Sequence, residues 1–224
     1  MSTVEILNTT STPAEQRLDQ LLAALDGLAV GGALAVQTGP RWDDLLPGLQ
    51  EKRWGQFDWR PLEEGPEVWL AELVRLEPNP RNNTIIGFFS RDHHRCDTLY
   101  AEAENAANED DTVAMARIGR RFLVAMHHHF RMEEEGLFPA FENRTGMRQG
   151  PTMVMRSEHE QMRGLMRQMD QAAETGNAGL MLKTGGTLLF VMQQHNVKEE
   201  QMLYPMAEAN LHPSDALLKE VQRL

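Results

Sequence analysis

The sequence predicts a small α+β domain followed by an all-α antiparallel four-helix bundle. Rare residues are unevenly distributed, because all four tryptophans precede residue 70 and all eight histidines lie between His93 and His212. Pro78 and Pro80 disfavour a regular helix between the two halves. Four long segments after them show helical spacing of apolar residues. We therefore expect a first domain at 1–76, a linker at 77–83, a bundle at 84–212 and a tail or short helix at 213–224.

The first domain alternates helical and strand patterns. The expected elements are, in order, a helix at 15–28, a strand at 33–36, a helix at 41–52 and paired strands at 57–62 and 68–76. Gly31 and Gly32 end the first helical pattern, and Glu64-Gly65-Pro66 reads as the turn between the paired strands. The pattern predicts two helices packed on one small sheet, with Trp59 and Trp69 in its core.

The bundle is predicted from four stripes of residues at three-and-four spacing. They are Ile86, Phe89, His93, Cys96 and Tyr100; Met115, Ile118, Phe122, Met126, His129 and Glu133; Met155, His159, Met162, Met166 and Met169; and Leu188, Met192, His195, Glu199, Met202 and Met206. Capping and breaking residues fall between the stripes, at Asp111-Thr112, Gly150-Pro151 and Gly176-Asn177. Short connections between four amphipathic helices predict an antiparallel arrangement.

Charge and cysteine content exclude several classes of protein. Lys and Arg number 22 and Asp and Glu 33, a net charge of −11, which argues against nucleic-acid binding and against docking on anionic membranes. Cys96 is the only cysteine, so an intrachain disulfide is impossible and a cytoplasmic location is expected. We expect no signal peptide. The longest apolar stretch, 21–36, contains Asp26 and three glycines, and is too broken to span a bilayer.

An internal repeat carries the chemistry. The motif His129-x-x-x-Glu133-Glu134 recurs as His195-x-x-x-Glu199-Glu200, and Asp92-His93 recurs at the same offset as Glu158-His159. Each copy of the longer motif is followed by Leu, an aromatic residue and a proline, which we expect to end a helix. The bundle is therefore predicted to consist of two helix pairs related by a pseudo-twofold axis.

The repeat places metal-ligand residue types on the apolar stripes. Residues four apart share a helix face, so each His-x-x-x-Glu presents an imidazole and a carboxylate together. Buried groups of this kind are costly unless they are paired or bind cations. The candidate ligands are His93, His129, Glu133, His159, His195 and Glu199.

Counting donors suggests which metal these residues bind. If both carboxylates bridge two ions and two imidazoles bind each, every ion has four protein bonds. An oxo or hydroxo bridge adds a fifth, which leaves an octahedral ion one open position. We expect two iron ions, with manganese or zinc less favoured. The competing interpretation is a set of salt-bridged His–Glu pairs in the core.

The order lone His, His-x-x-x-Glu, lone His, His-x-x-x-Glu resembles the haemerythrin-like (HHE cation-binding) domain over about residues 84–210. The resemblance implies an oxo-bridged non-haem diiron centre, with the six candidate residues as ligands. Oxygen-carrying haemerythrins have a fifth histidine where this sequence has Met155. The set of four histidines and two glutamates is more similar to that of diiron proteins that repair iron centres after nitrosative damage. Those proteins carry an N-terminal cysteine pair, which this sequence lacks.

The first segment, 1–76, contains Gln56-Phe57-Asp58-Trp59 and Glu64-Gly65-Pro66-x-x-Trp69. With these motifs it looks like a small sulphur-carrier-like domain of uncharacterised function, found ahead of haemerythrin-like modules in bacteria. Some of the bacterial proteins that combine these two domains are linked to denitrification and nitric oxide. The resemblance and the open metal position favour a protein that binds nitric oxide in scavenging, buffering or sensing, with dioxygen second. The first domain is a candidate docking site for a protein partner or redox donor.

Three other functions stay open: repair of, or iron supply to, damaged iron–sulphur or diiron centres; a diiron oxidase, peroxidase or nitric oxide reductase; and a zinc-holding structural regulator. Ferritin-like oxidases use Glu-x-x-His, and no histidine of this sequence has a glutamate three residues before it. A ligand-binding protein is therefore favoured over an enzyme.

The sequence also suggests positions and roles for residues near the motifs. Asp97 could orient the His93 imidazole, and Cys96 could lie near the metals, although packing is favoured. His94, His127 and His128 are expected at the surface or beside the ligands. Core packing is expected for Tyr100 and Tyr204, with a hydrogen bond to a bound ligand as the alternative. The residues expected to be solvated are Glu134, Glu135 and Glu200.

Overall fold

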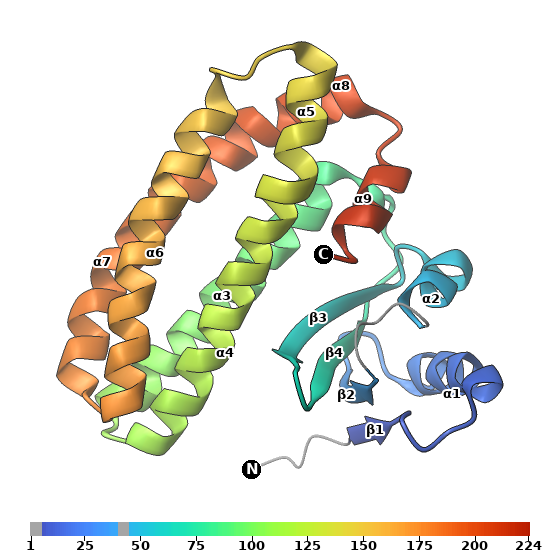
Figure 1. The fold of residues 1–224 in the computed structure, drawn as a ribbon, viewed down its shortest axis with the longest axis horizontal. Coiled ribbons are helices and arrows are strands. Elements are labelled where there is room, and N and C mark those ends of the chain that lie inside the picture. The colour runs from blue at the N-terminus through green and yellow to red at the C-terminus, as the bar shows by residue number, and fades with distance from the viewer. Residues whose placement is uncertain (1–5, 40–44) are drawn as a thin grey trace.

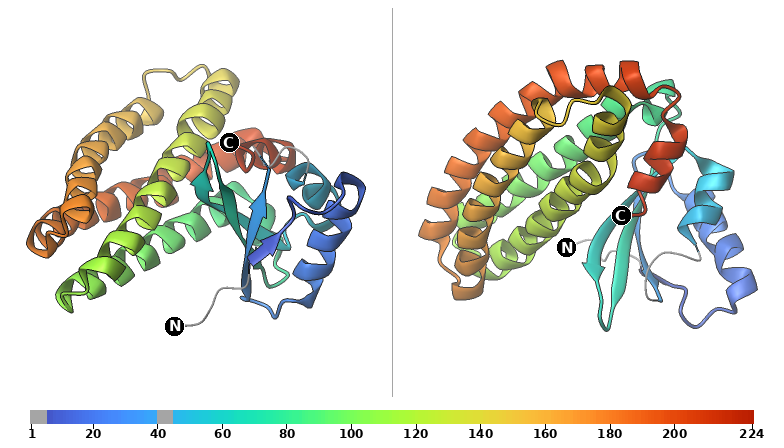
Figure 2. Two further views of the ribbon diagram at one scale, coloured as in Figure 1. Left: turned by 60° about the horizontal axis from the view of Figure 1, so that its bottom comes forward. Right: turned by 45° about the horizontal axis from the view of Figure 1, so that its top comes forward.

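A computed structural model describes residues 6–39 and 45–224 of the chain (Figure 1). A small sheet with two helices is followed by a bundle of long helices. This arrangement confirms the predicted fold class. The sheet lies between helices α1 and α2 on one side and the bundle on the other (Figures 1 and 2). None of the helices in the described residues is long and apolar enough to cross a membrane.

The sheet has four strands in the order β1-β2-β4-β3. The strands are β1 (Ile6–Asn8), β2 (Ala33–Thr38), β3 (Phe57–Glu64) and β4 (Trp69–Arg75). Strand β1 runs parallel to β2, and the other neighbours are antiparallel. The sequence predicted the last three strands and missed β1, because three residues are too few to show an alternating pattern.

Helices α1 (Ala14–Gly27) and α2 (Leu46–Arg53) cover one face of the sheet. Leucines of both helices pack on Trp59, which is 3% exposed, and Trp69 packs partly buried at the edge of this core. The predicted helix at 41–52 is observed from Leu46 onward, and its residues 41–44 lie outside the described part of the chain.

Four long helices form the bundle: α3 (Ile85–Asn108), α4 (Thr112–Arg131), α6 (Pro151–Thr175) and α7 (Ala178–Lys198). A short 3₁₀ turn, η2 (Pro80–Asn83), precedes them. Side-chain caps begin three of the helices, since Thr84, Asp111 and Asn177 each accept a hydrogen bond from the backbone N–H three residues later. Gly176 ends α6 in a left-handed conformation with φ 63°.

Two π-helical segments extend the bundle where the repeat predicted helix ends. Helix α4 continues through η3 (Met132–Leu137) into α5 (Phe138–Thr145), and α7 through η4 (Glu199–Leu203) into α8 (Tyr204–Leu211). The N–H of the first α5 and α8 residue bonds to the carbonyl five residues earlier, on Glu133 and Glu199. Pro139 and Pro205 follow directly. A proline has no N–H and clashes with the carbonyl four residues back, which the wider turn relieves. The expectation that these prolines end helices is therefore wrong.

The wider turn also changes which residues face the core. Met202 was expected on the buried stripe but is 50% exposed, whereas Leu203 is 1% exposed. A π turn adds one residue to the helical repeat and so shifts every later side chain. At the start of α3, which is a regular α-helix, the buried residue is Ile85 and not the expected Ile86, which is 37% exposed.

The chain ends with helix α9 (Asp215–Val221), which connects the bundle to the first domain. Val221 packs over Gly136 of η3 so closely that a Cβ there would lie 2.6 Å from Val221 Cγ2. The Gln50 amide donates a hydrogen bond to the Lys219 carbonyl at 2.9 Å. Arg91 of α3 and Asp58 of β3 form an ion pair at 3.2 Å. These contacts hold the sheet against the bundle.

Candidate metal centre

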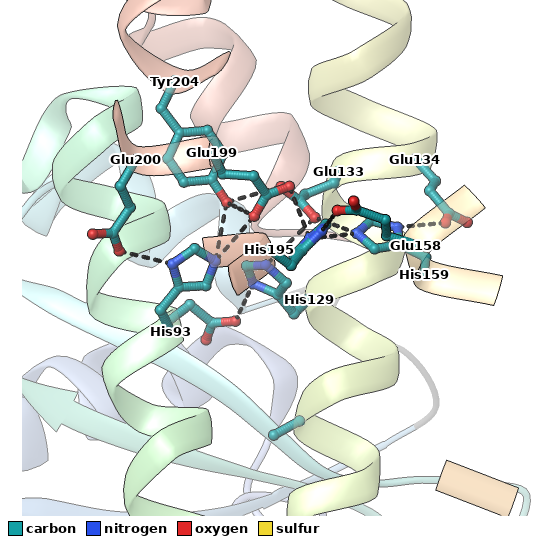
Figure 3. A network of polar contacts seen from close by, with 12 residues as sticks. His93, His129, Glu133, Glu134, Glu158, His159, His195, Glu199, Glu200 and Tyr204 are labelled. Carbon is teal, nitrogen blue, oxygen red and sulfur yellow. Dashed lines mark hydrogen bonds and ion pairs between the residues drawn. The ribbon is translucent and has the colours of Figure 1, made fainter. Parts of the chain in front are cut away.

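The six candidate ligands meet in the middle of the bundle (Figure 3). Each long helix contributes one imidazole, and each π-helical segment contributes one carboxylate. The set is His93 on α3, His129 on α4, Glu133 on η3, His159 on α6, His195 on α7 and Glu199 on η4. None is more than 4% exposed. Burial removes water as a partner, so these groups depend on one another or on a bound ion.

Each carboxylate lies between two imidazoles. Glu133 Oε2 is 3.4 Å from His129 Nε2 and 3.2 Å from His159 Nε2. Glu199 Oε2 is 3.2 Å from His93 Nε2, and its Oε1 is 3.1 Å from His195 Nε2. The Nε2 atoms of His159 and His195 are 3.1 Å apart. All four Nε2 atoms therefore point toward the same small volume.

Several of these atoms lack hydrogen bonds. Within residues 6–39 and 45–224, His129 Nε2, Glu133 Oε2 and Glu199 Oε1 are buried, and their close imidazole–carboxylate contacts do not have hydrogen-bond geometry. An unsatisfied buried polar group costs about 1–3 kcal/mol, and a cation among the three would remove that cost. Two overlapping donor groups are close enough to hold an ion: His93, His129 and Glu199; and Glu133, His159, His195 and Glu199. The donor set fits a pair of metal ions.

A second layer of four carboxylates orients the four imidazoles. The Nδ1–carboxylate pairs are His93 with Glu200 at 2.8 Å, His129 with Asp92 at 3.0 Å, His159 with Glu134 at 2.7 Å and His195 with Glu158 at 2.9 Å. An Nδ1–H that donates to a carboxylate leaves the Nε2 lone pair for a metal. Each pair has its equivalent in the other copy of the repeat, so the second layer follows the pseudo-twofold axis.

This layer corrects two expectations from the sequence. Glu134 and Glu200 were expected to be solvated, yet each holds an imidazole of the opposite helix pair. The signal was present, because both copies of the motif contain two successive glutamates. The partner of His93 is Glu200, and not Asp97. Glu135, by contrast, is exposed as expected.

Basic residues support three of the four second-layer carboxylates. Arg95 Nε lies 2.9 Å from Asp92, Arg163 Nη2 lies 2.7 Å from Glu134, and Lys198 pairs with Glu158. The repeat position equivalent to Arg163 is Asp97, an acid near Glu200. Glu200 is also the most exposed of the four carboxylates, at 40% of its side chain. The two sides of the centre therefore differ in their outer electrostatics.

The electrostatics of the centre favour positive charge. Burial lowers the pKa of His93, but hydrogen bonds to Glu199 and Glu200 outweigh it and raise the pKa to about 10. For His159, Glu133 and Glu134 outweigh burial in the same way and raise the pKa to about 9. Carboxylates that stabilise imidazolium here also stabilise a metal ion, which replaces the protons when it binds.

Tyr204, expected to pack in the core, also reaches into the centre. Its hydroxyl lies 2.8 Å from Glu133 Oε1, 3.0 Å from Glu199 Oε2 and 3.2 Å from His93 Nε2. The residue is fully buried, and burial together with the two carboxylates raises its pKa. The sequence carried one signal for this role, since the repeat has Phe138 at the equivalent position.

The remaining candidates lie outside this network. His94 and His127 are exposed, whereas His128 is buried without a hydrogen-bond partner for either ring nitrogen in the described structure. Cys96 packs in the apolar bundle core, where burial raises the pKa of its thiol. Tyr100 packs in the same core and donates to Glu104 at 2.9 Å.

Comparison with known proteins agrees with this geometry. The family model described as Hemerythrin HHE cation binding domain matches residues 84–209, more than half of the chain. The match begins at the N-cap of α3 and includes all six candidate ligands, whereas the sheet domain lies outside it. No curated protein and no solved structure matches the chain. The chain belongs to the hemerythrin HHE cation-binding domain family.

Proposed function

We propose that this protein is a non-haem diiron protein that binds a small diatomic ligand, nitric oxide first and dioxygen second, at the centre of the bundle. The observation that carries the proposal is the convergence of four oriented imidazoles on two buried carboxylates. Mixed imidazole and carboxylate donors suit iron. Iron bound here would supply an open coordination position and a reversible redox couple. The chain's residues hold the ions, orient the imidazoles and exclude water.

The preference for nitric oxide over dioxygen rests chiefly on a family resemblance, and one feature of the metal centre is consistent with it. Met155 stands where oxygen-carrying haemerythrins have a fifth histidine, and its repeat equivalent is Phe89. Both side chains are buried and apolar, so neither half of the centre offers a third imidazole from this position. The first domain also resembles domains found ahead of such modules in proteins linked to denitrification. Docking of a protein partner or redox donor on that domain is part of the proposal.

A binding role is favoured over thiol-dependent repair of iron centres. Cys96 is the only cysteine of the chain and is 2% exposed. Burial raises the pKa of its thiol, and the thiolate is the form that binds metals. No other thiol exists to pass iron to a damaged cluster.

The test is the metal content of anaerobically purified protein, with absorption spectra before and after addition of nitric oxide and, in a separate sample, of dioxygen. His129→Ala removes a candidate ligand, and His127→Ala is a matched control on an exposed position of the same helix. We expect two irons per chain and new nitrosyl bands in the wild type and in His127→Ala. Both should be lost or strongly reduced in His129→Ala.

Four results would contradict the proposal or its order of ligands. Zinc alone, or metal content independent of His129, would refute the diiron centre. Bound iron whose spectrum responds to neither gas would refute the binding role. A response to dioxygen but not to nitric oxide would reverse the order of the two ligands.

A further inference from the structure

The two halves of the metal centre differ at one pair of aromatic residues. The internal repeat pairs Phe138 with Tyr204, and each ring stacks on a candidate ligand. Phe138 lies 5.9 Å from the ring centre of His159, and Tyr204 lies 5.7 Å from that of His93. The rings thus occupy equivalent places. Only the Tyr204 side carries a hydroxyl, which points at the carboxylates between the imidazoles (Figure 3).

That hydroxyl has more acceptors around it than protons to offer. It lies within 3.2 Å of Glu133 Oε1, Glu199 Oε2 and His93 Nε2. His93 directs its Nδ1–H to Glu200, so in the neutral form needed for metal binding its Nε2 is an acceptor. A phenol has one proton and can satisfy one of the three. With His93 neutral, the other contacts bring lone pairs together, and a metal ion among them would relieve that repulsion just as a proton on His93 does in its absence.

The distances fit donors that share one metal ion. Two donors at right angles, each about 2.1 Å from an octahedral ion, lie about 3.0 Å apart. The three contacts of the Tyr204 hydroxyl span 2.8 to 3.2 Å, and His93 Nε2 is 3.2 Å from Glu199 Oε2. The donor group around His93 also has three members where the other has four. The Tyr204 hydroxyl lies within reach of two members of that group, His93 and Glu199, as a possible fourth donor.

We propose that Tyr204 is a seventh protein ligand, whose phenolate oxygen binds the metal ion held by His93. The inference rests on the proposed diiron centre. The O–H bond is lost as the oxygen–metal bond forms, and the proton is released to solvent, as is usual when metals bind protonated ligands. The two ions are then inequivalent. An ion held by His159 would have the Phe138 ring in the place equivalent to Tyr204, and because that ring offers no donor, this ion would be the one left open to an exogenous ligand.

The spectrum of the oxidised protein tests this inference. Phenolate bound to ferric iron gives a visible charge-transfer band, and resonance Raman excitation in that band enhances the tyrosine ring vibrations. Tyr100 and Tyr204 are the only tyrosines, so Tyr100→Phe is a matched control. In protein reconstituted with ferrous iron and oxidised with ferricyanide, we expect the band in the wild type and in Tyr100→Phe. We expect it to disappear in Tyr204→Phe at an unchanged iron content.

A band that survives in Tyr204→Phe, or a wild-type protein with two ferric irons and no phenolate vibrations, would overturn the inference and leave the diiron proposal intact. A wild type that binds no iron would refute the diiron proposal itself. If Tyr204→Phe fails to fold, ring-deuterated tyrosine in the Tyr100→Phe variant, where Tyr204 is the one tyrosine left, answers the same question. The enhanced vibrations must then shift with the label, and unshifted vibrations would overturn the inference.

Discussion

Glu158 on α6 holds His195 on α7, with its Oε2 2.9 Å from His195 Nδ1. The same relationship joins Asp92 and His129 at 3.0 Å in the first copy of the repeat. Because the bond fixes the imidazole tautomer and ring orientation, the carboxylate acts on the metal site without touching it. The acidic residue immediately before each lone histidine therefore positions the histidine of the neighbouring helix.

Removing that carboxylate should weaken metal binding. We expect Glu158→Ala to lower iron affinity roughly 10–100-fold, the usual effect of losing such a hydrogen bond. Glu158 is preferable to Asp92 as a target, because its basic partner Lys198 is 38% exposed, whereas Arg95 is 6% exposed and would be left buried without its carboxylate. Competition with a chromogenic chelator measures the affinity. Glu174→Ala, at an exposed position on the same helix, should bind iron like the wild type, and equal losses in both variants would contradict the assignment.

Metal removal should lower the melting temperature of the helical domain. A ligand present at 100 times its dissociation constant stabilises the folded state by about 2.7 kcal/mol. For a chain of this size that corresponds to roughly 5–10 °C. Circular dichroism melts with and without a chelator measure the shift. Tryptophan fluorescence reports the first domain in the same sample, since all tryptophans precede residue 70. Helical melting that is unaffected by the chelator would show that the buried donors do not depend on a cation.

Gly87 should not tolerate a side chain, although it lies in a helix. A Cβ there would sit 1.9 Å from the Arg81 carbonyl oxygen, a backbone atom of η2. We expect Gly87→Ala to destabilise the protein by about 1–3 kcal/mol. Gly186 on α7 is exposed with nothing within 4 Å of its Cβ position, so Gly186→Ala should stabilise by about 0.5–1 kcal/mol. Urea unfolding measures both. A neutral Gly87→Ala variant would mean that η2 and the start of α3 separate easily.

Cys96 should be a single-site reporter of bundle opening. Its thiol is 2% exposed, and burial raises its pKa. We expect no reaction with a disulfide reagent in the native protein and complete reaction with one equivalent in guanidinium. Chelation of the metal should speed the reaction, because the helices that surround Cys96 also hold the candidate ligands. Fast labelling of the metal-loaded protein would place the thiol at the surface.

The sequence by itself determined the fold class, the two-pair repeat and the residues that meet at the centre. These features are local: amphipathic spacing, caps and i, i+4 pairs follow from helix geometry alone. The sequence also predicted that His129, and not His127 or His128, faces the centre. This prediction followed from the internal repeat, in which His195 occupies the position equivalent to His129.

Tertiary structure decided what these signals could not show. The repeat distinguishes Glu134 and Glu200 from Glu135, but only the packing of one helix pair on the other brings them to His159 and His93. The short strand β1 likewise depends on β2. The π turns before Pro139 and Pro205 show the same limit, because a proline that ends an isolated helix can be accommodated where a packed bundle stabilises a wider turn. Those turns carry Glu133 and Glu199, and the second of them leads directly to Tyr204. Side-chain partners across helices depend on long-range packing, which no local pattern encodes.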